Sequence, residues 1–389
     1  MHGETTSLDT AAPAAVLKPS VPSGRVVSID ALRGFDMFWL IGGKGIVVAL
    51  AVLAGGWWAR TAEGQFSHSD SLGSWVGFTF WDFIAPLFLF VIGLSMPYSI
   101  SKRLERGESR RNLYRHIVQR TVVLILLGWL MNDWLMFQFP LRLSGVLPRV
   151  ALSYLVAALI VMGTGRRGQM AWTAGILLGY WAVMALVPVP GYGAGVYTAE
   201  GNLAGYIDRL LLPGKYCCAP YVPYGDHMGI LGTFPSGMHV MFGVFCGYLV
   251  RSAWTHGRKL LILAGGGVGA IALGWAWGLV FPIIMPLWTS SFVIYSTGWC
   301  MVVFALFYWI IDVLGYRRWA FPLVVIGANA ITIYVLENRF PFMDVANIFF
   351  RGVILHSGRL QTLVSATALV GTEWAFLYVL YRKKIFIKV

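Results

Sequence analysis

Long apolar segments separated by short polar connectors recur from about residue 27 to residue 381. Each is close to the ~20 residues that an α-helix needs to cross a bilayer, and the connectors hold the Gly, Pro and clustered charges that end helices. The pattern predicts an all-α, polytopic membrane helix bundle of about ten transmembrane helices. The expected spans are 27–54, 76–100, 117–136, 146–164, 170–188, 229–250, 260–281, 288–311, 319–337 and 361–381.

Two stretches fall outside this pattern. Residues 338–359 mix Phe-Pro-Phe with scattered polar residues, which favours an interfacial or re-entrant segment over an eleventh crossing. Residues 1–25 are rich in Ala, Pro, Ser and Thr and lack the apolar core of a signal peptide, so we expect a disordered cytoplasmic tail. Residues 26–389 then form one transmembrane domain.

Composition excludes a soluble globular protein. Of the 389 residues, 58% are hydrophobic and 12% are charged, and the mean hydropathy is +0.69. A soluble domain has about 45–50% apolar and about 25% charged residues, so this chain has too few charges to solvate a folded surface.

The net charge of +13 would fit nucleic acid or anionic lipid as a partner, and the position of the charges decides between them. With the N-terminus inside, 20 of the 30 Lys and Arg residues lie in cytoplasmic segments and eight lie on the opposite side. This asymmetry favours cytoplasmic termini and membrane lipids as partners, and no nucleic acid. Whether the chain forms a homodimer stays open.

Two long connectors, 55–75 and 189–228, lie on the predicted outer face and are expected to wall an extracytoplasmic pocket. The second contains Asp226-His227 and the cysteines Cys217 and Cys218, whose oxidation state stays open. Ionisable residues inside spans are costly, so they are candidates for function. They are Asp30, Arg33, Asp36, Lys44, Asp82, His239 and Glu373. Asp30 and Arg33, one helical turn apart, form either a self-neutralising interface cluster or part of a ligand site.

His68 is the sharpest candidate for chemistry, because it precedes the span that contains Asp82. A neutral imidazole takes a proton from a nucleophile near pH 7, and a carboxylate can orient its tautomer. Asp70 and Asp82 are both candidate partners. A loop histidine that is merely solvated is the alternative interpretation from the residues alone.

The sequence contains neither the ligand spacing of a metal site nor a phosphate-binding glycine loop. We therefore predict no metal. The glycines at 265–269 fall in a span, where they would let helices approach closely. A phosphorylated ligand would need basic side chains, and the densest run, Lys102 to Arg115, is cytoplasmic. Positive-inside topology alone also explains most of these charges.

Seven short motifs in this order resemble the heparan-α-glucosaminide N-acetyltransferase family and its bacterial, NagX-like homologues over roughly residues 26–389. They are Ser28 to Gly34; His68 with Trp75 to Gly77 and Asp82 to Phe90; Gly145 to Arg149; Gly205 to Arg209; Asp226 with Gly229 to Thr233; Leu287 to Phe292; and Gly327 to Ile331. Three features depart from the family. The gap between His68 and Trp75 is longer than the family's usual short spacing. Lys44 follows Gly42-Gly43 where the lysosomal branch has an Asn ahead of its glycines, and residues 282–286 lack the family's Asn-Lys.

The resemblance implies a transmembrane enzyme of the bacterial inner membrane that uses cytoplasmic acetyl-CoA to acetylate an amino sugar on the far side. The family's essential histidine corresponds to His68, oriented by Asp82 or Asp70. The cofactor's phosphates are assigned to Arg106, Arg110, Arg111, Arg115 and Arg318, and the remaining substrate-binding candidates are Asp226, Asn329, Ser290, Ser291, Asp30 and Arg33.

Alternatives remain open at this point. His68 acts either as general base or through a covalent acetyl-histidine. In the first case Asn329, Ser290 or Ser291 would donate to the oxyanion. A sugar or amphiphile transporter is the rival from another class, although no internal repeat is visible. An O-acyltransferase of a cell-surface glycan would keep the fold and change the acceptor.

Overall fold

The computed structural model describes residues 26–132, 144–212, 221 and 224–387. The predicted tail at 1–25 and the pair Cys217 and Cys218 lie outside the described residues. Within the described ranges the regular structure is helical apart from one isolated β-bridge, Val189 to Gly193, which confirms the all-α prediction. The helices are α1 (Val27–Phe38), α2 (Lys44–Ala54), α3 (Gly56–Gln65), α4 (Phe80–Glu105), α5 (Arg110–Met131), α6 (Val146–Gly163), α7 (Arg166–Leu186), α8 (Leu203–Leu211), α9 (Thr233–Arg251), α10 (His256–Gly278), α11 (Ser290–Tyr308), α12 (Phe321–Ala328), α13 (Ala330–Glu337), α14 (Phe342–His356) and α15 (Gln361–Arg382).

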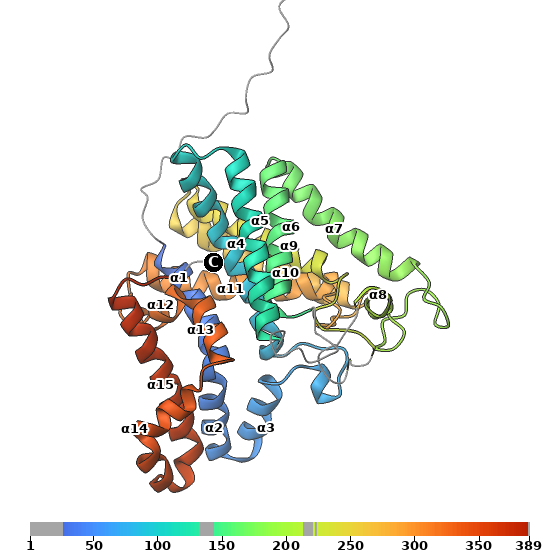
Figure 1. The fold of residues 1–389 in the computed structure, drawn as a ribbon. Helices are drawn as coiled ribbons and strands as arrows, with labels where there is room; N and C mark the ends of the chain where they lie inside the picture. The colour runs from blue at the N-terminus through green and yellow to red at the C-terminus, as the bar shows by residue number, and fades with distance from the viewer. Residues whose placement is uncertain (1–25, 133–143, 213–220, 222–223, 388–389) are drawn as a thin grey trace, which may run out of the picture.

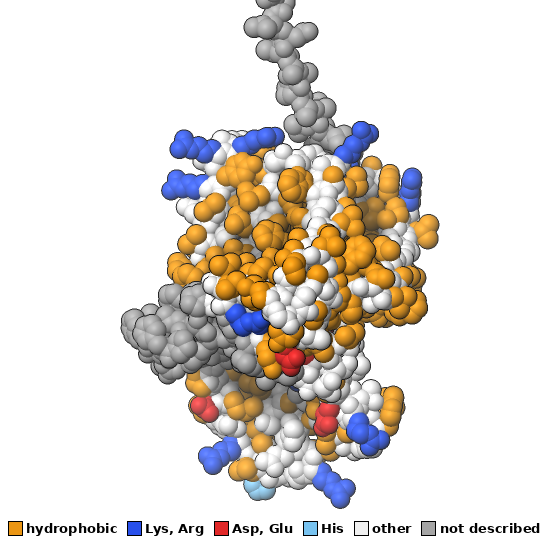
Figure 2. Space-filling model, turned by 90° about the vertical axis from the view of Figure 1, so that its right-hand side faces the viewer, with side chains coloured by type: hydrophobic (Ala, Val, Ile, Leu, Met, Phe, Trp, Pro, Cys, Tyr) orange, Lys and Arg blue, Asp and Glu red, His pale blue; other side chains and the backbone are white. Residues whose placement is uncertain are grey.

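Nine helical segments of the described chain are long and apolar enough to cross a membrane. They correspond to nine of the ten predicted spans, and the protein is therefore a multi-pass membrane protein. The surface agrees with a membrane-embedded protein. In Figure 2, hydrophobic side chains cover a broad part of the face in view, and Lys and Arg side chains lie toward the upper and lower ends of the molecule.

The first and the ninth predicted spans are both interrupted. Between α1 and α2, residues Trp39–Gly43 form a π-helical turn in which Gly42 has φ 123°. A residue with a Cβ is strained at that angle. The ninth span breaks at Asn329 into α12 and α13, of eight residues each, so neither is long enough to cross alone. The prediction of a continuous helix over 319–337 is wrong.

The segment before the last span, predicted as interfacial or re-entrant, contains the 15-residue helix α14. It packs against α15 as a helical hairpin at the lower end of the molecule, beside α2 and α3 (Figure 1). A 15-residue helix spans about 22 Å, shorter than the ~30 Å hydrocarbon core.

Glycines bring several helix pairs into backbone contact. A Cβ placed on Gly93 of α4 would lie 1.9 Å from the carbonyl oxygen of Val240 in α9, and one on Gly34 of α1 would lie 1.7 Å from that of Leu323 in α12. Of the glycines at 265–269, Gly267 makes such a contact, with α11, whereas Gly265 has open space beside it. The expected close approach thus holds for part of that cluster.

Candidate active site

The N-terminus of α4 holds a buried carboxylate. Thr79 caps the helix, and its backbone N–H donates to Oδ2 of Asp82 at 3.0 Å while its hydroxyl oxygen accepts from the Asp82 N–H at 3.3 Å. This reciprocal capping box satisfies amides that would otherwise lack partners. The N–H of Ser69 also donates to Oδ2 at 3.3 Å. The Asp82 side chain is fully buried, so its orientation is set by these donors.

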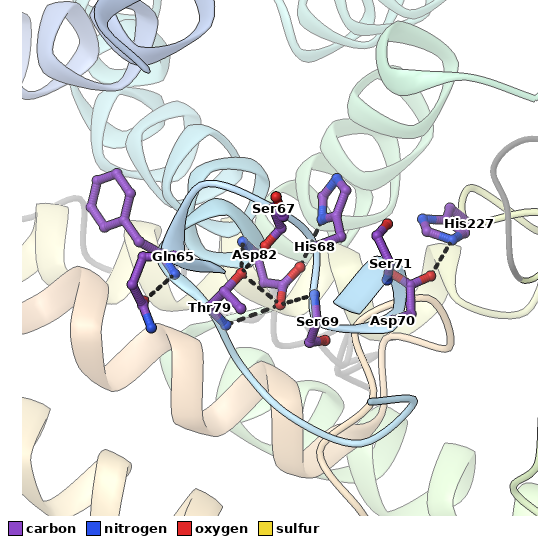
Figure 3. A network of polar contacts seen from close by, with 10 residues as sticks. Gln65, Ser67, His68, Ser69, Asp70, Ser71, Thr79, Asp82 and His227 are labelled. Carbon is purple, nitrogen blue, oxygen red and sulfur yellow. Dashed lines mark hydrogen bonds and ion pairs between the residues drawn. The ribbon is translucent and has the colours of Figure 1, made fainter. Parts of the chain in front are cut away.

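His68 lies against the remaining oxygen of that carboxylate. Its Nδ1 is 2.7 Å from Oδ1 of Asp82, and its side chain is 30% exposed (Figure 3). A carboxylate can only accept hydrogen bonds, so this contact favours the tautomer of a neutral His68 that carries its proton on Nδ1. The other ring nitrogen, Nε2, then has a free lone pair, which is the state required of a base at neutral pH.

The loop that carries His68 is anchored by an aromatic cluster. The ring of Phe66 lies 5.3 Å from those of Trp39 and Phe80, and Gln65 accepts the backbone N–H of Phe80 through Oε1 at 3.1 Å. Trp81 lies 6.4 Å from the His68 ring and also packs beneath Nζ of Lys44, at 4.5 Å. The broken first span and the start of α4 therefore position the histidine together.

A second imidazole–carboxylate pair lies beside the first. Nε2 of His227 is 2.9 Å from Oδ2 of Asp70, and the two imidazole rings are 5.9 Å apart (Figure 3). Burial opposes ionisation of Asp70, but its contact with His227, the charges of both histidines and the Ser71 N–H together hold the pKa of this carboxyl below its usual range. Of the two partners that the sequence left open for His68, the structure pairs Asp82 with it and Asp70 with His227.

The segment around His227 is fixed by two charged residues from other helices. Arg149 of α6 donates through Nη2 to the carbonyl oxygens of His227 (3.3 Å) and Gly229 (2.9 Å). Asp208 of α8 accepts the N–H groups of Asp226 (3.3 Å) and Ile230 (2.9 Å). Burial raises the pKa of Asp208 to about 6. Asp226 itself uses Oδ1 to accept the N–H of Met228 at 2.7 Å, within the same turn.

The candidates for oxyanion donation form hydrogen bonds to backbone groups. Ser290 and Ser291 donate to the carbonyl oxygens of Leu177 (2.7 Å) and Pro282 (3.1 Å). Asn329 lies at the break between α12 and α13, where its amide bonds to the backbone of Ile385 and Ile387 near the C-terminus. The contacts described for these three residues do not join them to His68, and their predicted role in the reaction stays a prediction.

Asp30 and Arg33 form an ion pair on α1 at 3.3 Å, and Arg33 also donates to Ser95 of α4 at 2.6 Å. This geometry is that of an interface cluster, the first of the two interpretations left open above. A role of the pair near a ligand stays a prediction.

The basic residues assigned to the cofactor lie at the ends of α4 and α5 and after α11. All are exposed, and Arg111 and Arg115 border an open hollow of about 780 Å³ along α5. The exposed residues are Arg106, Arg110, Arg111, Arg115 and Arg318. In the part of the chain that the structure describes, no three His, Cys, Asp or Glu side chains cluster as metal ligands would.

Two features of the site are not visible in the sequence. The pairing of Asp70 with His227 joins positions 157 apart, although the neighbouring Asp226-His227 marks the loop as polar. From the sequence alone, Arg149 is one of the positive charges of the predicted outer face and the last residue of the Gly145 to Arg149 motif. The structure shows it to be 3% exposed and to hold the His227 segment in place.

Comparisons with known proteins agree with the motifs. Residues 25–191 match a family model described as "Domain of unknown function (DUF5009)". The human heparan-alpha-glucosaminide N-acetyltransferase is 27% identical over 445 aligned positions, which cover 99% of this chain and 63% of the human protein. The mouse enzyme is 28% identical over 95% of this chain and 62% of its own length. The chain thus spans less than two thirds of the length of these two enzymes, and along nearly all of its own length it is similar to them.

Proposed function

We propose that this protein is an acetyl-CoA-dependent transmembrane acetyltransferase that acetylates the amine of an amino sugar. The observation that carries the proposal is the His68–Asp82 pair, an imidazole in contact with a buried carboxylate at the start of a candidate membrane-spanning helix, in a chain whose relatives are named as N-acetyltransferases. We place the protein in the cytoplasmic membrane of a bacterium, with both termini inside.

The two substrates would reach the pair from opposite ends of the bundle. Arg106 and the arginines in the first turns of α5 lie at the opposite end of α4 from Asp82, and α4 has 26 residues, or about 39 Å. Charge-assisted hydrogen bonds from these arginines suit the cofactor's phosphates. The pantetheine arm would then extend between the helices toward His68, and the amino sugar would approach from the outer end.

In the reaction, the free Nε2 of His68 takes a proton from the attacking amine. The nitrogen forms a bond to the acetyl carbonyl carbon, the carbon–sulfur bond breaks, and the imidazolium returns the proton to the thiolate. Asp82 keeps the proton on Nδ1 and stabilises the imidazolium while it exists. Transient acetylation of His68 is the alternative route.

Acetyl transfer by the purified full-length chain tests the proposal directly. The chain in lipid nanodiscs is given labelled acetyl-CoA and glucosamine, and N-acetylglucosamine is quantified. Acetylation that requires the intact protein supports the proposal. Absence of transfer to any amine or hydroxyl acceptor, from a protein that is folded, would reject it, whereas transfer to a hydroxyl alone would identify an O-acyltransferase.

One observation favours a second candidate, a transporter for a sugar or amphiphile. The two broken helices, α1–α2 and α12–α13, pack against each other, and interrupted spans are typical of transport sites. Uptake of labelled sugar by proteoliposomes without acetyl-CoA, and no acetylated product, would favour this candidate.

A further inference from the structure

The His227–Asp70 pair has no part in the reaction proposed above, although it lies directly beside the base. Its two side chains are 4% and 1% exposed and approach to 2.9 Å, and the His227 ring centre is 5.9 Å from that of His68. A buried charge costs free energy unless a partner compensates it, so two adjacent carboxylate–imidazole pairs are an expensive arrangement for structure alone.

Among the described residues, the groups that face His227 approach one of its ring nitrogens, Nε2. Oδ2 of Asp70 lies 2.9 Å from Nε2 of His227, and the ring of Tyr221 lies 6.1 Å from the His227 ring. Arg149 binds the backbone carbonyl oxygen of His227 and not its ring, and it is itself close to the carboxylates of Asp208 and Asp226. In the part of the chain that the structure describes, the other charged neighbour is the His68–Asp82 pair. With Asp70 ionised, His227 carries its proton on Nε2, and its Nδ1 can accept another.

The chemistry of N-acetylation requires two proton transfers from the acceptor. An amino sugar that arrives as an ammonium loses one proton to become nucleophilic and a second when its nitrogen bonds to the acetyl carbon. The leaving thiolate takes one of the two, and the other must go to solvent. His68 can hold only one proton at a time, because Asp82 already fixes the proton on its Nδ1.

We infer that the His227–Asp70 pair receives the first of these protons from His68. This rests on the proposed function. The ammonium proton passes to Nε2 of His68 and then to Nδ1 of His227, directly or through a water, and leaves to solvent. The ionised Asp70 stabilises the imidazolium that forms on His227. His68 is then neutral again when the amine attacks, and it takes the second proton and returns it to sulfur. His227 and Asp70 are positioning residues that act through His68.

The inference predicts a pH dependence that a structural role does not. When the amine arrives as an ammonium, at low pH, the first transfer is needed. When it arrives neutral, at high pH, that transfer is absent. His227→Gln is therefore expected to slow transfer tenfold or more at low pH and to approach the wild-type rate within about threefold at high pH. Asp70→Asn is expected to do the same, because it removes the charge that stabilises the imidazolium.

The experiment measures single-turnover acetylation of glucosamine by the full-length chain in nanodiscs, from well below to well above the pKa of the acceptor amine. The variants are His227→Gln, Asp70→Asn and, as a matched control, His356→Gln, whose side chain is exposed on α14. Stabilisation by coenzyme A against heat verifies that each variant is folded.

Losses that shrink as the pH rises, in both variants and not in the control, support the inference. Equal losses at every pH, wild-type behaviour of both variants, or failure of both to fold would overturn it and leave the pair with a structural role or none. A wild-type protein that transfers acetyl to no amine at any pH would reject the proposed function. An active wild type whose variants give parallel profiles would reject only this inference.

Discussion

Nδ1 of His68 lies 2.7 Å from Oδ1 of Asp82, and the loop of the histidine is tied to the same helix start that buries the carboxylate. The Thr79 capping box therefore has two roles. It supplies hydrogen-bond partners to backbone amides at the start of α4, and it fixes the carboxylate that orients the ring of the proposed base. Substituting His68 or Asp82 is therefore expected to lower the rate of acetyl transfer without weakening cofactor binding.

His68→Ala is expected to lower acetyl transfer by about 10²–10⁴-fold, because loss of a general base typically has that effect. Affinity for coenzyme A should stay close to that of the wild type, since the proposed phosphate site lies at the other end of α4. Single-turnover transfer and cofactor binding are measured on the same preparation. Wild-type turnover by this variant would reject the assignment and make His227 the next residue to test.

Asp82→Asn is expected to retain the fold and lose most of the transfer. The amide oxygen can still accept the backbone N–H groups of Thr79 and Ser69, but the amide NH₂ facing His68 favours the tautomer with the proton on Nε2. That tautomer cannot act as the base, so a loss of about 10²-fold or more is expected. Asp344→Asn, on the exposed side of α14, is the control. Equal rates for the two variants would contradict the orienting role of Asp82.

Neutralising the basic cluster is expected to weaken cofactor binding. Replacing Arg106, Arg110, Arg111 and Arg115 together by Gln should raise the Kd for coenzyme A by about tenfold or more and flatten its dependence on salt. Exposed ion pairs each contribute about 0.2–1 kcal/mol and are screened. Arg351→Gln, an exposed charge on α14, should leave the Kd unchanged. An unchanged Kd in the quadruple variant would remove this end of the bundle as the phosphate site.

Stability should fall as the pH rises through the pKa of Asp208. Burial raises this pKa to about 6, against 3.8 ordinarily, so the folded state binds the proton more tightly than the unfolded state. The associated stabilisation is complete below about pH 4 and is lost as the pH rises through about 6. The thermal unfolding temperature at pH 5 and pH 7.5 measures it, and Asp208→Asn is expected to reduce the difference. A difference as large as that of the wild type would assign the effect to another group.

Gly93→Ala is expected to disrupt the α4–α9 contact, because a Cβ there would lie 1.9 Å from a backbone carbonyl oxygen that cannot move without shifting α9. The variant should unfold at a markedly lower temperature or fail to accumulate in membranes. Gly175→Ala, on α7, has nothing within 4 Å of the added carbon and serves as the control. Equal stability of the two variants would show that the helices are not packed this closely.

The hydrophobic pattern predicted the helix class and nine spans because membrane crossing imposes a minimum apolar length on each segment. It did not predict the break at Asn329, since apolar residues continue through it and the side chain of Asn329 bonds to the backbone of Ile385 and Ile387, more than 50 residues away in the sequence. The pairing of His68 with Asp82 was predicted as one of two choices. Which of the two carboxylates contacts His68 depends on how the loop folds around Thr79, and the spacing of residues in the sequence does not determine that fold.

The close contact of Gly34 with Leu323 has a consequence for how the protein is made. The span that contains Gly34 meets α12 only after about 290 further residues have been synthesised. At about 5–20 residues per second, that interval is roughly 15–60 s. Throughout it, α1 must wait in the bilayer with its charged Asp30 and Arg33 neutralising each other, and Ser95 of α4 is the first partner from another span to reach them. The ion pair that stabilises the finished interface would thus first serve the biogenesis of the chain, by keeping an incomplete span inserted until its partner arrives.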